Sequence, residues 1–214
     1  MIIETALKAV YAFMEGKDSH LKVTEIEHPD VLLWLVWTIQ QYAKMVSWDE
    51  ARVKYGKALK DVMDYLAGNH HPNLKVHENG LVYTNGRDKA VTWMNSTVNG
   101  RPVVARTGYV VEFNALWYNA LCFVADLLSS DNGFVDYLHQ FSDKVSQSFV
   151  QTFLNEYGYL LDYVDGDMMD WSVRPNMIFA AAFDYSPLDS KQKKGVVDIV
   201  TKELLTPKGI RSLS

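Results

Sequence analysis

The chain has 214 residues, 48% of them hydrophobic, which is enough for one domain with a substantial core and excludes a disordered or low-complexity protein. Its net charge of −5, without a long run of Lys or Arg, gives no basic field for nucleic acid, which we exclude as a partner. Cys122 is the only cysteine, so an internal disulfide is impossible and the chain suits a reducing compartment.

Nothing in the sequence indicates secretion or membrane insertion. The N-terminus carries Glu4 and lacks a basic region followed by a cleavage site, which predicts no signal peptide. The longest apolar run, VLLWLVWTI at residues 31–39, is well below the roughly 20 residues needed to span a bilayer. We therefore expect a cytoplasmic protein with no membrane partner.

Apolar residues recur at helical spacing over most of the chain. In chain order, this spacing predicts helices at residues 2–14, from 28–30 onward, from 47 to 67, at 113–128, at 134–157, at 177–183 and from 186 to 204. Helix starts are indicated by the capping box of Ser47 with Glu50, by Asp131 or Asn132, and by Ser186 followed by Pro187.

Two long connections interrupt the helices, at residues 72–111 and 158–176, and the first shows little regular structure. Loops of this length in a compact domain are usually functional. Short connections on one side and long polar ones on the other predict an all-α fold of antiparallel helical hairpins that curl into a toroid, with the long loops on one face. An open α-solenoid is the alternative, but no fixed repeat period is visible.

Two clusters invite a metal site. His70 and His71 are adjacent, so they do not share a helical face, and we interpret them as a solvent-exposed helix end. The run DYVDGDMMD lacks the spacing and the final Glu of an EF-hand, so its acids are interpreted as loop caps and turn formers. There is no phosphate-binding loop or dinucleotide fingerprint, so we expect no metal and no cofactor.

The long loops and the helix that follows the first of them combine aromatic rings with amides, guanidinium groups and carboxylates. Pyranose C–H faces pack on aromatic rings while sugar hydroxyls need polar partners, so this composition is typical of a sugar site. The alternative is that the aromatic residues only pin the loops to the core. The residues concerned are Tyr83, Trp93, Asn95, Arg106, Asn114, Trp117, Tyr118, Asp170, Trp171, Arg174 and Asn176.

Five segments carry a family resemblance, and they occur in the family's order. They are HPDVLLWLVWTIQQY, ENGLVYTNGRDKAVTWMN, GYVVEFNALWYNAL, RPNMIFAAAFDYSPL and LLTPKGIRSLS. With these segments the chain resembles the amylo-α-1,6-glucosidases, the C-terminal family of glycogen debranching enzymes, over most of its length from Asp30 onward. The resemblance implies a partial (α/α)6 toroid that hydrolyses the α-1,6-linked glucose stub of a glycogen-like branched glucan, by inversion and without a metal.

The resemblance also implies the site residues. Asn95 stands where the family has an Asp, the candidate general acid, and an amide cannot donate a proton as a carboxylic acid does. Glu112 is therefore the candidate acid, or else a structural partner of Arg101 or Arg106. Substrate contacts are expected from Asp30, Trp34, Trp93, Asn95, Arg106, Glu112, Asn114, Trp117, Tyr118, Arg174 and Asn176.

The family continues past the last of the five segments with a YHxGTVWPW-like motif and further helices. We therefore expect residues 1–214 to form a single domain that is an incomplete fragment of a larger toroid, with the second catalytic group beyond Ser214. Helix faces without neighbours are expected to be exposed or to form a dimer. Two other functions stay open, a non-catalytic helical carbohydrate-binding or interaction domain and an (α/α)6 enzyme acting on another sugar.

Overall fold

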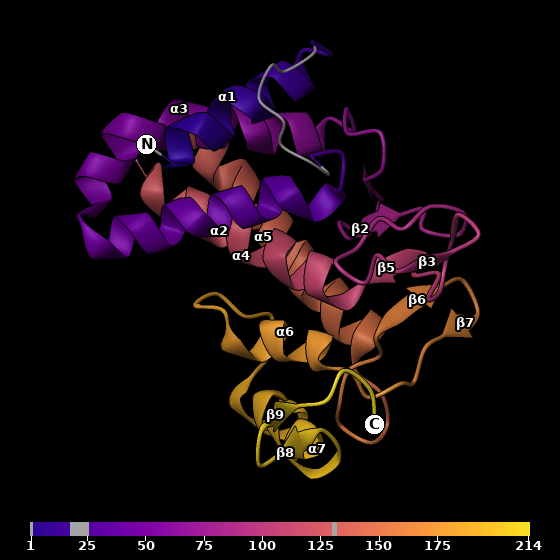
Figure 1. Ribbon diagram of the computed structural model, residues 1–214. Coiled ribbons are helices and arrows are strands. Elements are labelled where there is room, and N and C mark those ends of the chain that lie inside the picture. The colour runs from indigo at the N-terminus through magenta and orange to yellow at the C-terminus, as the bar shows by residue number, and fades with distance from the viewer. Residues whose placement is uncertain (1, 18–25, 130–131) are drawn as a thin grey trace.

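The computed structural model describes residues 2–17, 26–129 and 132–214 (Figure 1). Its helices are α1 (Ile2–Met14), α2 (Pro29–Met45), α3 (Trp48–Ala67), α4 (Val111–Leu127), α5 (Asn132–Phe153), the 3-10 turn η1 (Pro175–Met177), α6 (Ile178–Ala182) and α7 (Ser190–Glu203). Its strands are β1 (Lys75–Val76), β2 (Val82–Thr84), β3 (Thr97–Val98), β4 (Arg101–Pro102), β5 (Gly108–Val110), β6 (Tyr163–Asp165), β7 (Met168–Met169), β8 (Leu205–Thr206) and β9 (Gly209–Ile210).

The helices lie close to the predicted ranges, with differences at their ends. The hydroxyl of Ser47 accepts from the backbone N–H of Glu50 (3.0 Å), but the Glu50 carboxylate accepts from Tyr42 (2.6 Å), so the box is half formed. The last helix is capped by Asp189 in a full capping box, not by Ser186 as predicted. Helix α5 ends at Phe153, four residues before the predicted end, and the suggested cap Asp131 lies outside the described residues.

The all-α prediction is wrong. Within the described ranges, an antiparallel five-stranded sheet runs in the order β1-β2-β5-β6-β7, and β3-β4 and β8-β9 form two further pairs. All five strands of this sheet lie in the two long connections, where Tyr83 pairs with Tyr109 and Tyr109 with Val164. Strands of two or three residues leave almost no period-2 signal, and their partners are distant in the chain, so helical spacing could not reveal them.

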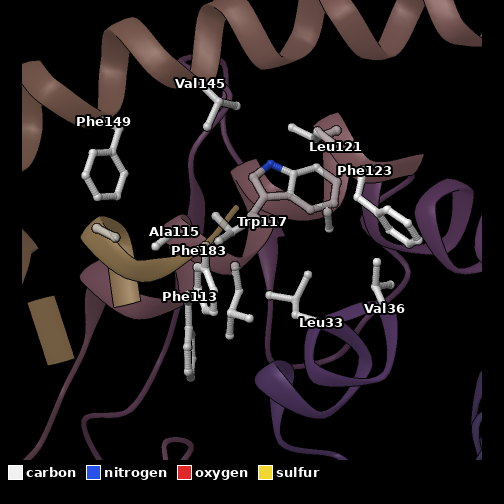
Figure 2. Packing of buried hydrophobic residues seen from close by; sticks show 14 of the residues in the cluster. Leu33, Val36, Phe113, Ala115, Trp117, Leu121, Phe123, Val145, Phe149 and Phe183 are labelled. Carbon is white, nitrogen blue, oxygen red and sulfur yellow. The ribbon is translucent and has the colours of Figure 1, made fainter. Parts of the chain in front are cut away.

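The described helices also do not form the predicted toroid. Helix α4 lies at the centre, in contact with α2, α3, α5 and α6, and nearly all its residues are buried. Figure 2 shows Trp117 of α4 between Leu33 and Val36 of α2 on one side and Val145 and Phe149 of α5 on the other. These neighbours cover α4 on nearly all of its faces because most of its residues are apolar, and strands of the five-stranded sheet, which an all-helical ring of hairpins does not contain, pack beside it.

The interpretation of the histidine pair as an exposed helix end is half wrong. His70 is exposed, but His71 is fully buried beside the ring of Phe13 (5.4 Å between centroids). Its Nδ1 accepts from the backbone N–H of Asn73 (3.1 Å), which places the proton of the neutral ring on Nε2. Burial lowers the pKa of His71 to about 4, so the ring is neutral at physiological pH.

The described residues show neither a membrane-spanning helix nor a cluster of metal-binding side chains. None of the helices in residues 2–17, 26–129 and 132–214 combines the length and the apolar character needed to cross a bilayer. In the same ranges, no three His, Cys, Asp or Glu side chains gather into a group that could hold a metal ion.

Candidate functional site

A pocket of about 450 Å³ opens between α2, the loop that follows β2 and the segment that includes η1 and α6. It is lined by Trp34, Trp93, Pro175, Asn176, Ile178 and Phe179, so it brings together three of the predicted sugar contacts. Trp34 is half-buried and its ring meets that of Phe179 edge-on (5.4 Å between centroids), while Trp93 is 49% exposed. Two indoles and one amide around an open, mostly apolar cavity are suited to a ligand with both flat C–H faces and hydroxyl groups.

Behind the pocket lies a buried cluster centred on Arg106. Its Nη1 and Nη2 donate to the two carboxylate oxygens of Glu112, the second at 2.7 Å. Its Nε and Nη2 donate to Oδ2 and Oδ1 of Asp162, at 2.9 and 3.0 Å. All three side chains are at most 2% exposed, so one cation is shared by two carboxylates away from water.

The sheet explains why these residues meet. Strands β5 and β6 pair antiparallel, and the pairing continues from Val111 N–H to the carbonyl of Asp162 (3.1 Å), so Asp162 lies beside the first turn of α4 and Glu112. On the other side, Gly86 approaches the Arg106 backbone so closely that a Cβ at this position would lie 2.1 Å from the Arg106 carbonyl oxygen. Gly86 is therefore required for the backbone of this loop to approach the backbone of Arg106 so closely.

Burial and the shared charge perturb the titration of the cluster. Burial raises the pKa of Asp162 to about 6, against the lowering effect of Arg106, and Glu112 raises it further. Burial alone would lower the pKa of Arg106, but Glu112 and Asp162 outweigh it and hold that pKa above its ordinary value. The guanidinium is thus permanently charged, and the Asp162 carboxyl group takes up a proton at a higher pH than an ordinary aspartic acid.

Asn176 connects the cluster to the pocket. Its Nδ2 donates to Oδ1 of Asp162 (2.7 Å), and its Oδ1 accepts from the indole Nε1–H of Trp93 (3.0 Å). Both oxygens of Asp162 accept hydrogen bonds, so the amide of Asn176 must present its NH₂ to Asp162 and its oxygen to Trp93. The buried charge therefore sets the orientation of the amide, and the amide holds the indole at the pocket wall.

This connection predicts different results for two variants that each remove one carboxylate charge from Arg106. In Asp162→Asn, one of the two acceptor oxygens is replaced by an NH₂ group. This group then faces an N–H donor of either Arg106 or Asn176, so the amide of Asn176 is no longer held in one orientation and Trp93 loses its fixed partner. The indole N–H of Trp93 is expected to exchange with solvent about tenfold faster, measured by NMR. Glu112→Gln is the matched control because Glu112 does not contact Asn176. Equal exchange rates in the two variants would contradict the connection.

Three predicted contacts lie away from the pocket. The side chain of Asn114 donates to the carbonyls of Val82 and Val110 and accepts from Val82 N–H, so it ties β2 to α4. Trp117 is fully buried and its indole N–H donates to the Gly80 carbonyl (3.2 Å). Tyr118 is half-buried, and burial raises its pKa to about 12. For these residues the structure shows contacts within the core.

The other predicted residues lie nearer the pocket. Asp30 is 8% exposed and precedes Trp34 by one helical turn, on the same face of α2. Asn95 is exposed and follows Met94, whose sulfur is 3.6 Å from Nδ2 of Asn176. Arg174 is 8% exposed and its Nε lies 3.6 Å from Oδ2 of Asp162, where it donates no hydrogen bond within the described chain.

Asp162 is the residue of this site that sequence reasoning missed, since it was interpreted only as one of several loop acids. One signal was present: Asp162 follows the apolar pair Leu160–Leu161, and both leucines are buried. An acid that continues a buried apolar run needs a cationic partner, and among the loop residues Arg106 was available.

The comparison with known proteins agrees with the resemblance. The sequence of residues 20–214 matches the model of the amylo-alpha-1,6-glucosidase family, while no curated protein matches the chain. The match covers most of the chain and includes every residue of the pocket and of the Arg106 cluster. The family supplies the coarse function, that of a glycosidase domain similar to those of glycogen debranching enzymes. The chain therefore belongs to the amylo-alpha-1,6-glucosidase family of glycoside hydrolases.

Proposed function

We propose that the chain binds a glucose unit of a glycogen-like branched glucan in the pocket between Trp34 and Trp93, as part of a protein that hydrolyses the α-1,6 linkage at branch points by inversion. The observation that carries the proposal is the pairing of two accessible indoles with Asn176, whose amide orientation is set by buried charge. A preorganised wall of this kind binds the sugar ring with little loss of conformational freedom. Asp30 and Asn95 stand at the edges of the same pocket in this proposal.

The general acid is a separate part of the proposal. Both carboxylate oxygens of Glu112 are bonded to Arg106 and the side chain is 2% exposed, which supports the structural alternative over the acid. A general acid must lie within hydrogen-bond reach of the leaving oxygen, directly or through one water. We therefore assign Glu112 to positioning Arg106, and through it Asp162 and Asn176.

The test is glucan binding by a pair of tryptophan variants. Trp93→Ala is expected to weaken the binding of a short malto-oligosaccharide by about tenfold, measured by calorimetry, because it removes one wall of the pocket. Trp48→Ala is the control, since Trp48 is also exposed (39%) but lies at the start of α3, away from the pocket. Equal affinities of Trp93→Ala and Trp48→Ala would remove the pocket as the binding site.

A second function is favoured by one specific observation, the engagement of Glu112 with Arg106. Together with the expectation from the resemblance that Asn95 stands at the position of the family's acid, it fits a carbohydrate-binding domain without hydrolytic activity. The two functions differ in one assay, the release of glucose from a branched limit dextrin by the full-length protein. Binding of the dextrin without release of glucose would select the non-catalytic domain.

A further inference from the structure

A second surface on this chain carries exposed aromatic rings. Tyr157 is 73% exposed and Trp171 is 43% exposed, and their rings are in contact (6.1 Å between centroids, 70° between planes). They come from two separate segments, the turn after α5 and the residues that follow β7. Tyr159 lies beside Tyr157 with nearly parallel rings (18°, 6.4 Å), so three aromatic side chains gather at this corner of the molecule.

The backbone that carries these rings is held by hydrogen bonds. Oδ1 of Asn155 accepts from the backbone N–H groups of Tyr157 (3.0 Å) and Tyr159 (3.3 Å). Gly158 closes the turn at φ +82°, and its carbonyl would lie 2.2 Å from a Cβ placed on Gly195, so helix α7 packs directly on the turn. Large rings on a fixed backbone lose little conformational entropy when a ligand packs on them.

The second segment is fixed in the same way. The N–H of Asp170 donates to the Tyr163 carbonyl (3.0 Å), and the Asp170 carboxylate accepts from Ser172 N–H (2.8 Å). Trp171 therefore projects from a backbone that continues the β6-β7 pairing and leads on to Pro175 and Asn176 of the pocket described above.

An open cleft of about 510 Å³ adjoins Tyr157, between the turn and α7. Its polar side chains carry both signs of charge, with Lys194 paired to Asp198. Mixed charges give no preference for an anion or a cation, while they offer donors and acceptors to hydroxyl groups. The charged and amide side chains of the lining are Asn155, Glu156, Asp189, Lys191, Gln192, Lys194 and Asp198.

We propose that Tyr157, Trp171 and the adjoining cleft form a second carbohydrate-binding surface, which takes a chain segment of an α-1,4-glucan outside the pocket. The choice of ligand rests on the proposed function, while the surface rests on its own exposed rings and cleft. The segment of residues 171–176 connects this surface to the pocket, because it begins at Trp171 and ends at the pocket residues Pro175 and Asn176. Two attachment points on one polymer raise its local concentration at the pocket, so the surface matters for long glucans and not for short ones.

The test compares long and short glucans in the full-length chain. The Tyr157→Ala/Trp171→Ala double variant is expected to bind glycogen about tenfold more weakly, by affinity electrophoresis in glycogen gels. Its affinity for maltotriose, measured by calorimetry, should stay within about twofold of the parent chain, because that ligand occupies only the pocket. Tyr137→Ala is the control, since Tyr137 is similarly exposed (47%) on α5 but lies outside this surface.

The outcomes separate this surface from the pocket. Unchanged glycogen affinity in the double variant overturns the second surface, whatever Trp93→Ala does. Weaker glycogen binding in the double variant together with no effect of Trp93→Ala supports the surface and overturns the pocket. Equal weakening by Tyr137→Ala also overturns the surface. Circular dichroism melting of all variants checks that each one is folded, as expected for substitutions of exposed side chains.

Discussion

Arg106→Met is expected to lower the free energy of unfolding by about 3–5 kcal/mol, measured by urea denaturation at pH 7. The substitution leaves Glu112 and Asp162 buried, at 2% and 1% side-chain exposure, without the cation that both of them share. Uncompensated buried charge is among the few causes of single-residue effects of this size. The size of the loss in free energy of unfolding tests whether water is excluded from the Arg106 cluster to the extent that its burial indicates.

The loss should also depend on pH in a defined direction. Burial raises the pKa of Asp162 to about 6, and removal of Arg106 takes away the main influence that lowers it. A carboxyl group whose pKa is higher in the folded state than in the unfolded chain binds a proton on folding, so stability falls as pH rises through this range. The difference between Arg106→Met and the parent chain is therefore expected to shrink from pH 7 to pH 5.

An exposed arginine in the same connection provides the control. Arg101 lies in β4 and is exposed, so Arg101→Met should change the free energy of unfolding by less than about 0.5 kcal/mol. A loss below about 1 kcal/mol in Arg106→Met, or a loss that grows as the pH falls, would contradict the description of a buried shared cation.

Asn95→Asp is expected to raise the release of glucose from a branched limit dextrin by the full-length protein by about 10²–10⁴-fold, the usual contribution of a general acid. The resemblance implies that Asn95 stands where the family has its candidate acid, and Asn95 follows Met94, which contacts the pocket residue Asn176. A carboxylic acid at this exposed position carries the proton that an amide lacks. The rate is measured as glucose released per enzyme at pH 5, where a larger share of an exposed aspartic acid is protonated than at pH 7.

Two further variants make this result decisive. Asn95→Gln keeps an amide and should release glucose at the parent rate. A higher rate in Asn95→Gln would show that the carboxyl group does not cause the rise in Asn95→Asp. Glu112→Gln should retain the parent rate within about tenfold if Glu112 only positions Arg106. Loss of more than about 10²-fold in Glu112→Gln, without a rise in Asn95→Asp, would assign the acid to Glu112 instead.

Most helices of this protein could be predicted from the sequence because their signal is local. Apolar residues at helical spacing located α1, and Ser47 located the start of α3 through a hydrogen bond to Glu50. The last helix was placed too early because Ser186 and Pro187 also suit a helix start, whereas Ser186 instead donates to the Ala180 carbonyl. Competing local signals of equal strength are resolved only by packing.

The residue types of the candidate site could be recognised in the sequence, but not which of these residues share a pocket. Its residue types, Trp93, Arg106, Arg174 and Asn176, were visible as an unusual composition of the long connections, and the family could be read from motif order. Which of them share a pocket was not visible, since Trp34 and Asn176 come together only when α2 packs near α6. Trp117 has the same chemistry as Trp93 but lies in the core, because α4 is covered on nearly every face.

The sequence by itself therefore determined the family, the helices and the kinds of side chain available for binding a sugar, because these depend on local pattern and residue type. Only the tertiary structure decided the mixed α and β architecture, the pairing of Arg106 with Glu112 and Asp162, and the orientation of Trp93 by Asn176. Each of these depends on strands or side chains far apart in the chain whose contacts form when buried charge and unpaired backbone groups must be satisfied.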